Sequence, residues 1–267
     1  SVFRRQRRVN VAQKEEWTRI REFCANKLDH NKKKYRGLIF KRLVSSLEGG
    51  PAAYPTSPKE RQTGVSTNNS GETAFQRALV NSKSALMGFD GYEEYISWKD
   101  YELPIVFSKR PRRACVDLIG SSERLGTFIC ELKYKSEGSI SGNRADYAIF
   151  QALLYYAAVK RDAALLDDNC VYRIQPPTFR WAEIARGKTL LVLGAGAAIW
   201  TKARSGENAD RVKSLIADVQ RTLGVRLIFS VMSSASFAPA HKGNGRYLPA
   251  FRGLAEKLPR LSIVDFA

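Results

Sequence analysis

The stretch from Cys115 to Tyr134 constrains the fold of this chain more than any other. It contains two apolar segments typical of β-strands, joined by a polar segment, SSERLG, that is typical of a hairpin turn. Because side chains alternate between the two faces of a strand, a symmetrical hairpin places Ile119 opposite Ile129 and Asp117 opposite Glu131. Charged side chains would then lie inside strands where apolar side chains would pack better.

On such a hairpin, Asp117 and Glu131 share one face, with Cβ atoms about 4.5–5.5 Å apart. Two carboxylates that close repel each other unless one stays protonated or a cation lies between them. Lys133 follows one pleat further along the same face. The alternative is a solvated outer face with an ordinary Glu–Lys pair, but Ile119 and Ile129 flank the charges on that face. The pattern therefore favours a site for a divalent cation.

Asp117, followed on the next strand by Glu131-Leu132-Lys133, resembles the motif of the PD-(D/E)XK nuclease superfamily. Val116 stands where that family has its proline. The resemblance implies an α/β restriction-endonuclease-like core, in which helices flank a central mixed sheet. It also implies that Asp117 and Glu131 hold Mg²⁺ or Mn²⁺, and that Lys133 positions or helps to deprotonate the attacking water.

Residues 144–166 contain good helix formers and an apolar stripe, which predicts a helix. Gln151 and Tyr155 are four residues apart and therefore share one face of it. This pair alone would also suit an amphipathic core helix with a polar edge. One helix after the Glu131 strand, it resembles the QxxxY signature of the RecB-like exonuclease branch of the superfamily. That resemblance places both residues beside the catalytic centre.

The segment 70–88 predicts a further helix, capped by Ser70, with an apolar stripe that reaches Leu86. Glu72 lies on this stripe. The segment resembles the first core helix of these nucleases, which implies that Glu72 is a further catalytic and metal-binding carboxylate. The alternative is an acid that complements the helix dipole. Other possible carboxylate donors are Glu93, Glu94 and Glu102.

The charge of the chain indicates a polyanionic partner. Its 44 Lys and Arg residues against 26 Asp and Glu residues give a net charge of +18. A solvated basic face is the alternative for any single cluster. The residues expected to bind nucleic acid are Arg4, Arg5, Arg7, Arg8, Lys32, Lys33, Lys34, Lys109, Arg110, Arg112 and Arg113. We expect DNA rather than RNA as the partner.

Composition also sets the expected organisation. Residues 1–48 are expected to form a basic helical segment, residues 49–71 a linker or mobile loop, and residues 72–267 the nuclease domain. No run reaches the roughly 20 apolar residues of a membrane span, so we expect no membrane partner and a cytoplasmic location. The chain has only two histidines and no Cys-x-x-Cys pair, which disfavours a zinc site.

The leading hypothesis is therefore a metal-dependent nuclease. One alternative is a catalytically silent nucleic-acid-binding module on the same fold, although a pure binder gains nothing from carboxylates that face phosphate. Another is a nucleotide-binding enzyme that uses Gly194 and Gly196, but the third glycine of a dinucleotide loop is missing. The sequence gives no readable dimer interface or protein partner.

Overall fold

The computed structural model describes residues 2–28, 34–48, 71–105, 114–134, 145–195, 199–232, 240–243, 246–251 and 258–266. The helices are α1 (Val2–Lys27), α2 (Lys34–Glu48), α3 (Gly71–Asn81), α4 (Ala145–Asp168), α5 (Trp181–Arg186), the 3-10 helix η1 (Thr201–Arg204) and α6 (Glu207–Leu223). The strands are β1 (Ser84–Phe89), β2 (Tyr92–Pro104), β3 (Cys115–Ser122), β4 (Gly126–Tyr134), β5 (Thr189–Ala195), β6 (Arg226–Met232), β7 (Ala240–Gly243), β8 (Arg246–Leu248) and β9 (Arg260–Ile263).

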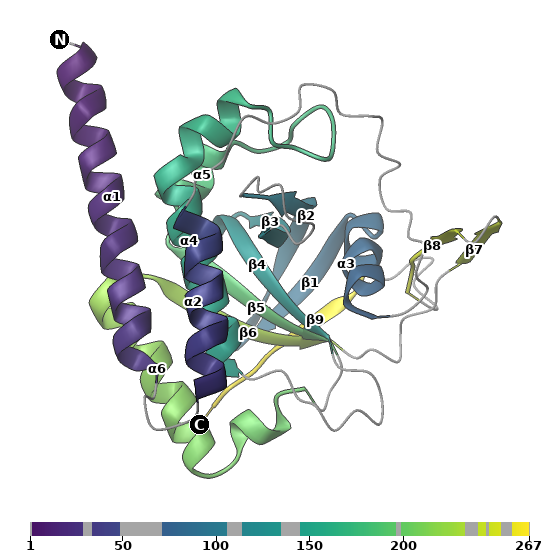
Figure 1. The fold of residues 1–267 in the computed structure, drawn as a ribbon. Helices are drawn as coiled ribbons and strands as arrows, with labels where there is room; N and C mark the ends of the chain where they lie inside the picture. The colour runs from purple at the N-terminus through teal and green to yellow at the C-terminus, as the bar shows by residue number, and fades with distance from the viewer. Residues whose placement is uncertain are drawn as a thin grey trace.

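Among the described residues, seven strands form a closed mixed barrel in the order β1-β2-β3-β4-β5-β6-β9 (Figure 1). The expected fold, an open central sheet flanked by helices as in the restriction-endonuclease-like core, is therefore wrong. The reason is β9, which pairs in parallel with β1 and antiparallel with β6. This short strand joins the two edges that an open sheet would leave exposed, so their backbone groups gain hydrogen-bond partners.

The predicted hairpin is confirmed. β3 and β4 are antiparallel neighbours, Ile119 pairs with Ile129, and the turn occupies residues 123–125. The ladder ends at the pair Leu118–Cys130. Asp117 therefore lies one residue beyond the last paired position, where the two strands begin to separate.

Two hydrophobic clusters surround the barrel wall. The inner cluster contains residues from each barrel strand, among them Met87, Leu118 and Leu193, together with Phe75 and Leu79 of α3. The outer cluster joins α1, α2, α4, α5 and α6 to the opposite faces of the strands. Figure 1 shows α1, α2 and α4 side by side on one flank of the barrel, with α3 on the other. Strands β3 and β4, which carry the carboxylates of the hairpin, thus have apolar clusters on both faces.

The helix predicted for residues 70–88 is too long. α3 ends at Asn81, and β1 begins at Ser84, so Leu86 belongs to a strand. The Ser82 hydroxyl donates to the Leu79 carbonyl at 2.6 Å, and Lys83 has a φ of 62°, a value that ends a right-handed helix. The next strand is the long strand β2, which carries Glu93, Glu94 and Glu102.

The N-terminal helices belong to the outer layer. Trp17 and Ile20 of α1 and Leu47 of α2 are buried in the same cluster as α4. Arg161 of α4 lies over the Trp17 ring at 4.8 Å. Residues 49–70 of the predicted linker lie outside the described residues. In the part of the chain that the structure describes, no helix has both the length and the apolar character needed to span a bilayer.

Candidate active site

The separation of β3 from β4 creates the candidate site. Beyond the last ladder pair, Asp117 Oδ2 accepts a hydrogen bond from the Leu132 backbone N–H at 2.9 Å. The Gln76 side-chain amide of α3 donates to the Asp117 carbonyl at 2.5 Å. The Asp117 carboxylate thus replaces the backbone acceptor that a paired strand would offer to the Leu132 N–H. Helix α3 holds the Asp117 backbone through Gln76.

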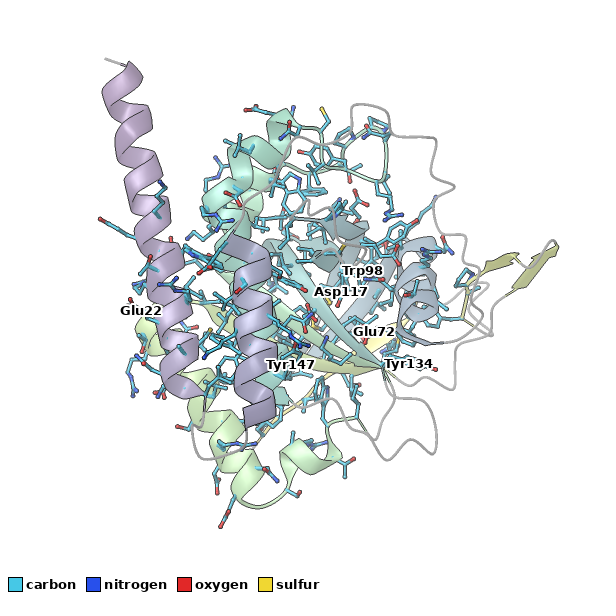
Figure 2. All side chains as sticks on the ribbon, in the orientation of Figure 1. Glu22, Glu72, Trp98, Asp117, Tyr134 and Tyr147 are labelled. Atoms are coloured by element: carbon cyan, nitrogen blue, oxygen red, sulfur yellow. The ribbon has the colours of Figure 1, made fainter. Side chains whose placement is uncertain are left out.

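Glu72 lies further along the same edge of β4. Its Oε2 accepts from the backbone N–H of Tyr134 at 3.1 Å. Amides two residues apart on one strand edge are separated by roughly 7 Å, so the Glu72 and Asp117 carboxylates follow one another along that edge. Figure 2 shows Glu72 and Asp117 near this end of β4, with Tyr134 and Tyr147 beside them. The Leu132 carbonyl points to the same side as its N–H, toward Asp117.

Glu131 and Lys133 lie on the face of β4 that packs toward α4. Glu131 is 0% exposed and Lys133 is 6% exposed. The Lys133 ammonium donates to Glu131 Oε1 at 2.5 Å. The other oxygen, Glu131 Oε2, is buried and accepts no hydrogen bond from any of the described residues. An unsatisfied buried carboxylate oxygen is costly, so it marks a position where a donor or a cation is needed.

The pKa shifts follow from burial and crowding. Burial raises the pKa of Asp117 to about 6, and the nearby Glu72 carboxylate adds to that effect, although Lys133 opposes it. Burial and the neighbouring Asp117 hold the pKa of Glu131 well above its usual range. Two carboxylates this close repel each other unless one is protonated or a cation lies between them.

The lysine is the counterpart of these carboxylates. Burial alone would lower the pKa of Lys133, but Glu131, Asp117 and Glu72 outweigh burial and raise it. Its ammonium therefore stays charged at neutral pH. Three carboxylates surround one ammonium, so the cluster has an excess of negative charge that one divalent cation would neutralise.

Helix α4 places two predicted residues over this cluster. The Gln151 amide donates to the Tyr155 hydroxyl at 3.2 Å. Tyr155 is buried, and its pKa is raised first by burial and then by the Glu131 and Asp117 carboxylates. The predicted QxxxY pair and the predicted hairpin therefore meet at one place.

Two residues at the site were missed in the sequence. Tyr147 lies one helical turn before Gln151, and its pKa is raised by burial while Lys133 and Glu131 also act on it. Its spacing of four residues from Gln151 would have identified it, since both lie on one helix face. Gln76, which holds the Asp117 backbone, carries no such signal because its partner is a carbonyl on a distant strand.

The residues present fit a hard divalent cation. Asp117 and Glu131 supply carboxylate oxygens, which Mg²⁺ and Mn²⁺ prefer, and Glu131 Oε2 is the unsatisfied atom. Within the described residues, no group of three or more His, Cys, Asp or Glu side chains is arranged to hold a metal. Magnesium is often held by one or two carboxylates and several waters. Glu72 would reach such a cation only after its carboxylate leaves the Tyr134 amide.

The other possible carboxylate donors have different partners. Glu102 forms ion pairs with Arg77 and Arg173, at 2.9 and 3.4 Å. Glu93 pairs with Arg260 and Glu94 with Arg124, on strand β2 toward its start. None of these three joins Asp117 among the described contacts.

The expected basic residues are only partly described. Lys109, Arg110, Arg112 and Arg113 lie outside the described residues, as do Lys32 and Lys33. Lys34 begins α2, and Arg4, Arg5, Arg7 and Arg8 lie in the first turns of α1.

Gly194 serves packing. A Cβ atom at this position of β5 would lie 2.4 Å from side-chain atoms of Ile199 and Trp200. Only glycine fits there, so close packing accounts for Gly194 and a nucleotide-binding role is not needed to explain it. Gly196 lies outside the described residues.

No protein-family model, no curated protein and no solved structure matches this chain. The functional argument therefore rests on the geometry of the carboxylates and the lysine.

Proposed function

We propose that this protein is a metal-dependent nuclease, a phosphodiester hydrolase that acts on nucleic acid, with DNA favoured over RNA. The observation that supports it best is the pair of Asp117, partly exposed, and Glu131, fully buried, beside Lys133, with Glu131 Oε2 lacking any donor in the described part. This combination resembles the PD-(D/E)XK motif, although it lies on a closed barrel rather than an open sheet.

Each side chain has a role that follows from its position. Asp117 and Glu131 would hold Mg²⁺ or Mn²⁺, which activates water and neutralises charge at a phosphate when bound. Glu131 holds the Lys133 ammonium in place, where it would stabilise the charge that develops on the phosphate oxygens. Gln151 and Tyr155 would fix the face of α4 against the carboxylates.

The charge of the chain supports a polyanionic substrate. The net charge of +18 attracts phosphate groups whatever their sequence. The arginines Arg4, Arg5, Arg7 and Arg8 lie at the start of α1, whereas its second half is buried against α4 through Trp17 and Ile20. Replacement of these four arginines, rather than deletion of the helix, would therefore test the arm while the buried second half of α1 stays in the chain. All four cysteines are free, which is consistent with a reducing cytoplasmic setting.

Cleavage of end-labelled linear DNA, circular DNA and RNA tests the proposal. Wild-type protein should cut with Mg²⁺ or Mn²⁺ and lose that activity in EDTA, because a metal-activated water is required. Asp117→Ala should be inactive. The matched control is Glu123→Ala, which removes an exposed carboxylate from the turn of the same hairpin and should cut like the wild type.

Two results would contradict the proposal. One is cleavage that persists in EDTA, and the other is wild-type activity in Asp117→Ala. Tight binding of DNA without cleavage under any metal would instead favour the catalytically silent binding module.

A further inference from the structure

A second surface carries stacked aromatic and basic side chains. Phe89 and Tyr92 flank the turn between β1 and β2, and their rings are stacked with centroids 4.9 Å apart and an interplanar angle of 6°. Arg124 lies over the Tyr92 ring at 4.1 Å, and Arg226 lies over the Phe89 ring at 5.9 Å. The result is a row of four planar groups, guanidinium, ring, ring and guanidinium, which we call the stacked row.

The stacked row lies at the end of the barrel opposite to the carboxylates. Arg124 belongs to the turn between β3 and β4, and Glu131 lies several residues further along β4. At about 3.3 Å per strand residue, the two ends are separated by roughly 20 Å. The row is therefore a separate surface from the candidate active site.

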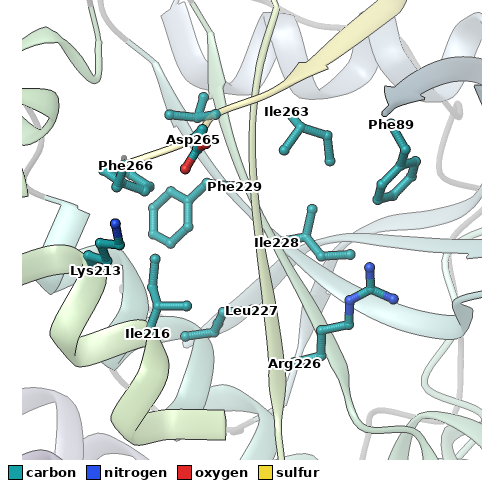
Figure 3. Close-up of a pocket in the computed structure, with 11 residues that line it drawn as sticks. Phe89, Lys213, Ile216, Arg226, Leu227, Ile228, Phe229, Ile263, Asp265 and Phe266 are labelled. Atoms are coloured by element: carbon teal, nitrogen blue, oxygen red, sulfur yellow. The ribbon is translucent and has the colours of Figure 1, made fainter. Parts of the chain in front are cut away.

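A cavity of about 290 Å³ adjoins the row. Figure 3 shows Phe89 and Arg226 on one side of it, Lys213 on the other, and Ile228 between them. Its remaining walls are mostly apolar side chains of α6, β6 and the residues after β9, including Phe229. This volume is at the small end of the range for small-molecule sites, about 300–1,000 Å³. It suits one planar ring with its substituents rather than a large ligand.

The barrel wall opens at this cavity because β9 is short. In the described ladder between β6 and β9, Ser230 pairs with Ile263 and Val231 pairs with Ser262. A further hydrogen bond runs from the Val264 N–H to the Phe229 carbonyl. Closer to the start of β6, near Leu227, the described residues provide no strand partner on that side. Ile263 and Arg226 are exposed at this gap, whereas Leu227, Ile228 and Phe229 behind them are buried.

The chemistry of this surface matches a nucleotide. The two rings stack on each other and lie beneath Arg124 and Arg226, so a base would stack on the outer face of the Arg124 guanidinium, whose side chain is 62% exposed, while Lys213 and Arg226 supply positive charge for a phosphate. The acidic groups that face them are Asp265 on the cavity wall and Glu94, which lies 3.8 Å from Arg124. Asp90, in the turn between Phe89 and Tyr92, and Glu123, next to Arg124, are further exposed acids, so the three basic side chains (Lys213, Arg226 and Arg124) carry no excess of charge over their acidic neighbours.

We propose that the stacked row and its cavity bind one unstacked base and the adjoining phosphate of a single-stranded nucleic acid. A duplex hides its base faces, so it could offer this surface only its phosphates. The site does not depend on the cleavage proposed for the carboxylates, because binding here needs neither metal nor chemistry.

Binding of a labelled oligothymidylate in EDTA, where no metal-dependent cleavage occurs, tests the site. Phe89→Leu keeps an apolar side chain but removes the ring, and Arg226→Gln removes an exposed guanidinium without opening the core. Each should weaken single-strand binding about tenfold, since stacking of a base on the row contributes on that scale. Affinity for a duplex of the same length should change less than about twofold in Phe89→Leu, because that variant loses no charge.

Two matched controls separate this site from general effects. Tyr95→Leu removes a ring of the same hairpin that is 55% exposed and lies outside the row. Arg221→Gln removes an exposed arginine of α6, whose side chain is 76% exposed. Both should bind the single strand within about twofold of the wild type, because neither side chain belongs to the stacked row.

Equal single-strand affinity in the wild type, Phe89→Leu and Arg226→Gln would overturn this inference, as would equal losses in the two controls. The outcome is independent of the nuclease proposal. A protein that shows these losses in EDTA but never cuts with Mg²⁺ would keep the binding site and contradict the nuclease.

Discussion

Two buried ionic clusters lie toward the same end of the barrel. The first, which we call the paired cluster, consists of Asp100 and Glu102 of β2 with Arg77 and Arg173. The second, which we call the carboxylate cluster, consists of Glu72, Asp117, Glu131 and Lys133. Both contain several carboxylates, but only in the paired cluster does each described carboxylate oxygen have a hydrogen-bond donor and each carboxylate a guanidinium counterpart.

In the paired cluster, each described acceptor has donors. Asp100 is 1% exposed and accepts from the backbone N–H groups of Tyr101, Arg173 and Ile174. Two guanidinium groups against two carboxylates balance the charge. The cluster fastens the segment after α4 to strand β2, which is a structural role.

In the carboxylate cluster, the match is incomplete. Lys133 is the single described cation among three carboxylates, and Glu131 Oε2 accepts no hydrogen bond in the described part of the chain. The raised pKa does not distinguish the clusters, because burial raises the pKa of Asp100 and of Asp117 to about 6 alike. What distinguishes them is the count of donors. The unsatisfied Glu131 oxygen is what supports the proposed cation site, whereas a raised pKa alone indicates burial.

The strongest test compares Glu131→Gln with Asp100→Asn. Glu131→Gln removes a charged oxygen from the proposed metal site, so cleavage should fall by at least about 10³-fold, beyond the loss of one preorganised polar group. Asp100→Asn alters the paired cluster, which touches no substrate in the proposal. Its rate of cleavage per folded molecule should stay within a few-fold of the wild type.

Single-turnover cleavage of labelled DNA, normalised to the folded fraction, measures both rates. An Asp100→Asn rate that falls as far as that of Glu131→Gln would erase the distinction between the clusters.

The next largest effect is expected for the lysine. Lys133→Ala should lower the cleavage rate by about 10²–10³-fold, because a charge that stabilises the transition state is lost. Lys133→Arg should restore little, since a planar fork does not replace a compact ammonium beside Glu131. The control is Lys160→Ala, which removes the partner of Glu16 in the outer layer and should leave the rate unchanged. Full rescue by Lys133→Arg would show that any positive charge suffices.

The site was more predictable than the fold. The period of two in the strands and the turn between them were enough to pair Ile119 with Ile129, because hairpin contacts are local. The four-residue spacing was enough to place Gln151 and Tyr155 on one helix face. These patterns depend only on neighbouring residues.

The barrel could not be predicted because its closure is not local. The strand β9 has four residues, and its partners on β1 lie far from it in the sequence, near the other end of the barrel's strand order. Nothing in the segment RLSI indicates which edges it joins. Gln76 and the paired cluster were missed for the same reason, since their hydrogen bonds connect α3 or the segment after α4 to distant strands.

The paired cluster should matter for stability rather than for chemistry. An asparagine at position 100 offers one acceptor oxygen to three backbone N–H groups, so Asp100→Asn leaves a buried donor unsatisfied. The free energy of unfolding should fall by about 2–3 kcal/mol. Urea denaturation followed by circular dichroism measures it. Asp90→Asn, in the exposed β1–β2 turn, is the control and should be within about 0.5 kcal/mol of the wild type.

The smallest expected effect is the dependence of stability on pH and magnesium. Folding raises the pKa of Asp117 to about 6, so between pH 4 and pH 6 the unfolded chain loses a proton that the folded protein keeps. The free energy of unfolding should therefore fall as the pH rises through this window. Because Asp117 is partly exposed, its contribution to this fall in the free energy of unfolding is about 1–2 kcal/mol. Asp100 adds a fall of the same sign, since burial raises its pKa as well.

Bound magnesium should restore only the part of the free energy of unfolding that the carboxylate cluster loses as the pH rises. At neutral pH, Mg²⁺ at ten times its dissociation constant should stabilise the wild type by about 1.4 kcal/mol, because it binds the folded state. Asp100→Asn keeps the carboxylate cluster and should show the same gain, whereas Glu131→Gln should show none. Thermal unfolding at pH 5 and pH 7, with and without Mg²⁺, measures all of these terms. An equal magnesium gain in Glu131→Gln would mean that the cation binds elsewhere, and the unsatisfied Glu131 oxygen would then need another explanation.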